Sequence, residues 1–120
     1  MVFSTHVHNH GDMHIEDVDE RDSTWEVWES TFRVYFATGP SRSIRTVDVT
    51  DATFSEVHAW AKETAPAGVL IAIALVGRDD RGLKGLTWLL GMDPNDYPDT
   101  PYRERMFAEL QENASPTAAP

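Results

Sequence analysis

The stretch VLIAIALV at residues 69–76 decides the fold of this 120-residue chain. Its odd and even positions are both apolar, and a strand of this kind buries both of its faces inside a sheet. Glycines at positions 68 and 77 bound the run, which is too short to cross a bilayer. The stretch therefore predicts a central β-strand of a water-soluble protein.

Strand patterns lie on both sides of this stretch. Residues 24–39, TWEVWESTFRVYFATG, alternate in polarity and predict one long strand, followed by a turn at 39–41. Residues 42–50 predict a shorter strand with a polar face, which suits the edge of a sheet. After the central strand, GRDDRG at 77–82 predicts a tight turn and 83–92 a returning strand.

Two helices complete the pattern. Thr53 and Glu56 have the spacing of a capping box, and Pro66 ends the helix that they open. Thr100 as N-cap and Pro101 in the first turn predict a second helix. The expected order is β-β-α-β-β-α, an α+β fold whose four-stranded, mainly antiparallel sheet carries both helices on one face.

Composition divides the chain into three parts. Residues 1–23 hold six acidic residues, one arginine and four histidines, and large apolar residues are few. Such a segment does not offset the entropy of its own ordering. We therefore expect an acidic, His-rich leader over 1–23, a single α+β domain over 24–112, and a disordered tail over 113–120.

The formal net charge of −10 bears on partners and location. Phosphate backbones are bound through lysine and arginine, so this charge argues against direct nucleic-acid binding. A protein partner or a homo-oligomer fits better. With no cysteine and no signal-peptide pattern at the N-terminus, we expect a cytoplasmic protein without disulfides, thiol catalysis or membrane attachment.

The leader contains the one local pattern that resembles a metal site. Imidazoles and carboxylates at these spacings suit Zn or Ni. A helix would align the histidines at four-residue intervals, whereas an extended chain would align alternate ones; the turn-forming Asn9–Asp12 disfavours a helix. The alternative is a flexible tether whose charge changes as its histidines titrate near pH 6.5. The candidate ligands are His6, His8, His10, His14 and Asp12.

A second candidate site lies in the first predicted strand. One face, with Phe32 and Phe36, suits the core. The opposite face holds residue types that are enriched at binding hot spots, and we predict that it binds a partner unless the leader or the last helix covers it. The predicted partner-binding residues are Trp25, Val27, Arg33 and Tyr35.

No catalytic motif stands out. His58, the domain's one histidine, is expected on the surface of the first helix without an orienting carboxylate. The sequence therefore indicates a small, acidic, non-enzymatic protein-interaction module. One alternative is a DNA mimic that inhibits a nucleic-acid-binding protein, and the other is a His/carboxylate metal-binding protein.

Three short stretches carry a resemblance. SEVHAWAKE at 55–63, with Gly82-Leu83 and Gly91-Met92-Asp93 at strand ends, resembles small proteins of actinobacteria and their phages whose function is not known. The resemblance covers residues 25–100 at most. No function comes with this resemblance, and it assigns no site residue; the expected interaction module is a factor of phage or accessory type.

Overall fold

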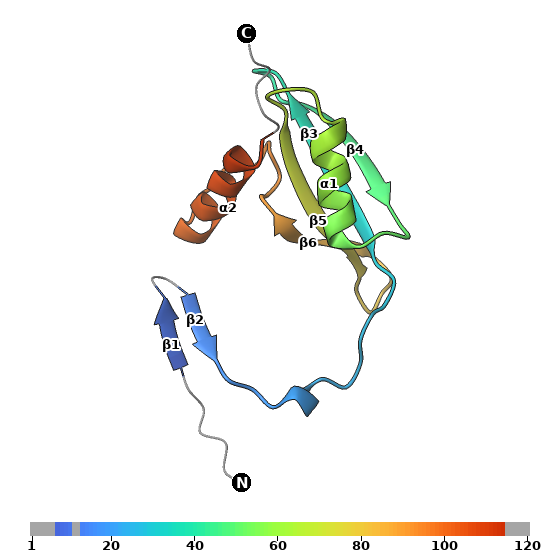
Figure 1. The fold of residues 1–120 in the computed structure, drawn as a ribbon, viewed down its shortest axis with the longest axis vertical. Coiled ribbons are helices and arrows are strands. Elements are labelled where there is room, and N and C mark those ends of the chain that lie inside the picture. The colour runs from blue at the N-terminus through green and yellow to red at the C-terminus, as the bar shows by residue number, and fades with distance from the viewer. Residues whose placement is uncertain (1–6, 11–12, 115–120) are drawn as a thin grey trace.

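The chain folds around a four-stranded antiparallel sheet, in a computed structural model that describes residues 7–10 and 13–114 (Figure 1). The strands lie side by side in the order β4-β3-β5-β6. The elements of this domain are β3 (Thr31–Thr38), β4 (Ser43–Val49), α1 (Phe54–Thr64), β5 (Leu70–Arg78), β6 (Lys84–Leu90) and α2 (Pro101–Glu112). The α+β class and the β-β-α-β-β-α order are confirmed.

The place of β5 inside the sheet follows from its composition. It pairs with β3 on one side and β6 on the other, and residues 71–74 are fully buried. The apolar side chains on both faces of such a strand are removed from water, and this burial stabilises the fold by roughly 25 cal/mol for each Å² of apolar surface. The polar β4 lies at an edge, as the sequence predicted.

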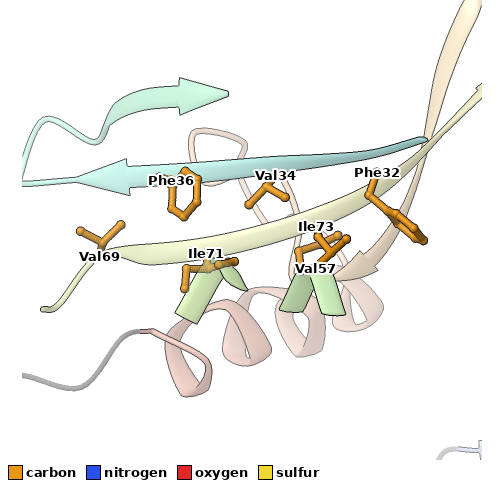
Figure 2. Close-up of a cluster of buried hydrophobic side chains, with 8 residues drawn as sticks. Phe32, Val34, Phe36, Val57, Val69, Ile71 and Ile73 are labelled. Carbon is orange, nitrogen blue, oxygen red and sulfur yellow. The ribbon is translucent and has the colours of Figure 1, made fainter. Parts of the chain in front are cut away.

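The main core lies between the sheet and α1. Alternate positions of β3 direct Phe32, Val34 and Phe36 toward the helix, because side chains in a strand point to opposite faces in turn. Val57 and Ala61 of α1 meet them, together with Ile71 and Ile73 of β5 and Val69 just before that strand (Figure 2). This cluster uses one face of the sheet only.

The start of α1 is fixed by the capping box that the sequence predicted. The Thr53 hydroxyl accepts a hydrogen bond from the Glu56 amide at 3.2 Å, and the Glu56 carboxylate accepts one from the Thr53 amide at 2.8 Å. Two backbone amides that a helix end leaves without partners are thereby satisfied. Ala65 caps the other end, and Pro66 follows it.

α2 begins as predicted and packs differently from the expectation. The Thr100 hydroxyl accepts a hydrogen bond from the Arg103 amide, with Pro101 in the first turn. We expected both helices on one face, but among the described residues the α1 core contains none from α2. Leu110, the buried residue of α2, instead stands against Gly91 just after β6.

Gly91 explains how α2 comes so close. Its φ of +67° lies in the left-handed region, which favours glycine. A Cβ at this position would lie 3.2 Å from two side-chain carbons of Leu110. Glycine therefore permits both the sharp end of β6 and the close approach of the helix.

The region before β3 differs from the prediction in two ways. A hairpin of β1 (Val7–His10) and β2 (Met13–Glu16), followed by the 3₁₀ turn η1 (Glu20–Asp22), stands where the sequence predicted a leader without regular structure. Figure 1 shows this hairpin apart from the main sheet. β3 begins at Thr31, not near residue 24, so the predicted long strand is six to seven residues too long. Residues 115–120 of the predicted tail lie outside the described residues.

Candidate functional site

The sheet face opposite the α1 core carries the strongest candidate site. Strand alternation places Arg33 and Tyr35 there, and the pairing registers add cross-strand neighbours from the other strands. All of these side chains are half-buried or exposed. We name this surface the open face and define it by Arg33, Tyr35, Asp48, Val76, Leu86 and Trp88.

An ion pair between Arg33 and Asp48 lies at one end of the open face. Arg33 of β3 lies directly opposite Asp48 of β4, and its guanidinium donates two hydrogen bonds to the carboxylate at 2.8 and 3.1 Å. This fork geometry holds the arginine in one orientation. The Arg33 guanidinium lowers the pKa of Asp48, and the carboxylate raises the pKa of Arg33. Both groups are charged at neutral pH, and both remain partly open to solvent.

Two aromatic rings meet at the middle of the open face. The ring centroids of Tyr35 and Trp88 lie 5.1 Å apart, although their strands are separated by β5. Contact across an intervening strand is possible because Ala72 and Ala74 lie beneath, opposite Tyr35 and Trp88 respectively. Both alanines are fully buried. The small side chains of β5 thus make room for a rigid aromatic pair.

The structure brings together two of the four predicted partner-binding residues. Arg33 and Tyr35 share the open face as expected. The placement of Trp25 and Val27 on the same strand face is wrong, because both precede β3. The side chains of Trp25 and Val27 are exposed, that of Trp25 to 78%. Trp28, which was expected on the core side of the strand, is 85% exposed. Whether Trp25 and Val27 bind a partner stays a prediction.

Trp88 is the residue of this site that sequence reasoning missed. It alternates with Leu86 and Lys84 along β6, so the face of the strand on which it lies could be predicted. Its contact with Tyr35 could not be predicted, because a contact across β5 depends on a register that includes a β-bulge between Ile73 and Ala74. The alternation of alanine and isoleucine in β5 was the one available signal.

Three of the five predicted metal ligands, His8, His10 and His14, belong to the strands of the β1–β2 hairpin. His6 and Asp12 lie outside the described residues. The extended form that the sequence left open is the one observed, and position 14 pairs with position 9. No group of three or more potential ligands comes together within residues 7–10 and 13–114.

His58 is less exposed than the sequence indicated. Its ring stacks on Phe54, with centroids 5.9 Å apart, and its Nε2 is buried without a hydrogen-bond partner in the described part of the chain. Burial lowers the pKa of His58 below 6.5, and the charge of Lys62 lowers it further. The imidazole is therefore neutral at neutral pH and has no carboxylate to orient it as a general base.

Two hollows flank α1. One, of about 600 Å³, lies beside its N-terminus and is lined by residues 28–31, 50–53 and Glu56. The other, of about 550 Å³, lies between β4 and α1, with Val47 and Trp60 on its walls. The Glu56 carboxylate, which borders both, is held by the capping box.

Comparison with known proteins adds no relative. No family model, curated protein or solved structure matches this chain. Over the described ranges, none of the helices has the length and apolar character needed to cross a bilayer.

Proposed function

We propose that this protein is a small, acidic, non-enzymatic interaction module that binds another protein through its open face. The observation that carries the proposal is the Tyr35–Trp88 pair, which is held rigidly over buried alanines and remains partly exposed. Exposed leucine at position 86 extends the same surface. An aromatic and apolar patch of this kind on a soluble domain marks an interaction site.

The chemistry of the open face suits a binding hot spot. Tryptophan, tyrosine and arginine dominate such spots, because they present large contact areas with few rotatable bonds. Here the arginine is already paired with Asp48, and the two rings already touch. Little side-chain freedom remains to be lost on binding, which favours affinity.

The segment before β3 supplies a second contact in this proposal. Residues 13–29 contain seven acidic residues and one arginine, and their apolar side chains are exposed. We infer that this segment tethers the same partner and orders further on binding, with its carboxylates meeting lysine and arginine. The exposed apolar residues are Met13, Ile15, Val18, Trp25, Val27 and Trp28.

Alanine variants of the open face test the proposal. Tyr35→Ala and Trp88→Ala should each weaken binding of a captured partner roughly thirtyfold, which corresponds to a loss of about 2 kcal/mol. Tyr97→Ala is the control, since Tyr97 is an exposed aromatic residue outside the open face, in the loop before α2. Affinity capture followed by calorimetry with the captured protein measures the difference, and circular dichroism checks the fold of each variant.

Comparison with Tyr97→Ala decides whether the open face binds the partner. A partner lost by both open-face variants and retained by Tyr97→Ala supports the proposal. Equal retention by all three folded variants would exclude the open face as the binding surface. Trp25→Ala separates the tether from the face, because Trp25 is exposed and precedes β3, so the variant should weaken binding without changing the stability of the domain.

A further inference from the structure

The free edge of β6 differs from the other edge of the sheet. β6 pairs with β5 on one side only, so one row of its backbone amides and carbonyls is available. Lys84 is its one charged residue, and Leu83, Leu86 and Leu89 beside or within it are exposed. β4, the other edge, carries Arg45 and Asp48. Charges commonly protect an edge from pairing, and β6 has few.

We propose that β6 pairs with β6 of a second copy of this chain, antiparallel about a two-fold axis, to form a continuous eight-stranded sheet. An isologous contact requires a surface that complements itself. The regular part of β6 runs from Lys84 to Trp88, because Leu89 is the extra residue of the β-bulge. The centre of that regular part, Leu86, is the position where the axis falls.

The side chains of this register complement one another. Leu86 meets Leu86 of the partner copy, which shields a side chain that is 38% exposed in the single chain. Lys84 falls opposite Trp88 of the partner copy, where an ammonium over an indole is favourable. Gly85 falls opposite Thr87 of the partner copy, which leaves room for the hydroxyl side chain.

Charge supports the antiparallel direction. Residues 78–84, around the β5–β6 turn, hold three basic and two acidic side chains, a net charge of +1, whereas residues 91–100, in the loop after β6, hold three acidic and no basic side chains, a net charge of −3. An antiparallel pairing about Leu86 sets the turn of one copy beside the start of that loop in the other. This contact occurs twice, once at each end of the paired strands, and each time it brings opposite net charges together.

Single cysteines test the register directly, since the chain has none of its own. Residues opposite each other in antiparallel strands have Cα atoms about 4.5 or 5.5 Å apart, which a disulfide spans. Leu86→Cys should therefore cross-link rapidly under mild oxidation. Leu83→Cys is the control, because this leucine is more exposed than Leu86 but, three residues from the axis, lies about 20 Å from its counterpart.

A charge exchange tests the same axis without oxidation. Leu86→Glu and Leu86→Lys each place two like charges opposite each other, and each should raise the dissociation constant of the dimer about tenfold or more. An equimolar mixture of the two variants should recover dimers by forming the mixed pair. Analytical ultracentrifugation of the full chain over a range of concentrations measures dimer formation by each variant and by their mixture. Circular dichroism checks that both variants fold.

The outcomes are separable from those for the open face. Wild-type protein that sediments as a monomer throughout, or Leu86→Cys that cross-links no faster than Leu83→Cys, overturns the proposal. Tyr35→Ala should remain dimeric while losing its other partner. Leu86 and Trp88 belong to both surfaces, so Tyr35→Ala is the variant that separates the edge pairing from the proposed function.

Discussion

His58 combines three properties that set how stability responds to pH. Its Nε2 is buried and has no hydrogen-bond partner among residues 7–10 and 13–114, its ring stacks on Phe54, and burial lowers its pKa. In the unfolded chain the same imidazole titrates near 6.5. Below that value the unfolded state binds a proton that the folded state resists, so protons favour unfolding.

We expect the free energy of unfolding to fall as the pH drops from about 7.5 to about 5.5. The loss begins as the pH passes the unfolded pKa and ends below the folded pKa, where both states are protonated. His58→Gln should flatten this part of the profile, as measured by urea unfolding at several pH values. His14→Gln is the control, since its side chain is exposed in the hairpin. An unchanged slope in His58→Gln would show that the imidazole protonates equally in both states.

Individual residues show where sequence reasoning succeeds and fails. Arg33 and Tyr35 were placed correctly, because strand alternation depends only on position in the sequence. Their partners Asp48 and Trp88 were not identified, since each contact depends on how two strands align. Trp25 and Val27 continue the same alternation, but nothing in the pattern marks Thr31 as the start of the strand.

At the scale of elements, the capping box of α1 makes a quantitative prediction. Thr53→Ala removes the hydroxyl that accepts from the Glu56 amide, and it should lower the free energy of unfolding by about 1 kcal/mol. Ser55→Ala in the same turn is the control, because Ser55 is exposed and takes no part in the box. Urea denaturation of both variants measures the difference. Equal stability of the two variants would contradict the role given to the cap.

The elements themselves were largely predictable, and the exceptions have physical causes. Both helices begin where their capping residues predict, and β5 takes the central position that its two apolar faces require. The β1–β2 hairpin was missed because its composition is polar, and a two-stranded hairpin gains little stability from burial. The packing of α2 depends on Gly91, whose backbone geometry the sequence does not reveal.

For the whole molecule, the separation of the hairpin from the main sheet predicts that the leader is dispensable for folding. β1 and β2 pack mainly on each other (Figure 1). A chain lacking residues 1–23 should unfold cooperatively, with stability within about 0.5 kcal/mol of the full chain. Calorimetric melting of both chains checks this. A broad or strongly shifted transition in the shorter chain would show that the leader stabilises the domain.

The position of β3 between β4 and β5 has a consequence for how the protein is made. The ribosome delivers β3, β4 and α1 first, so one side of β3 pairs early while its other side waits for β5. Until residues 70–78 emerge, Phe32 and Val34 lack their neighbours Ile71 and Ile73. A nascent chain that has emerged only as far as Pro66 therefore displays an apolar strand edge, which is prone to pair with other chains.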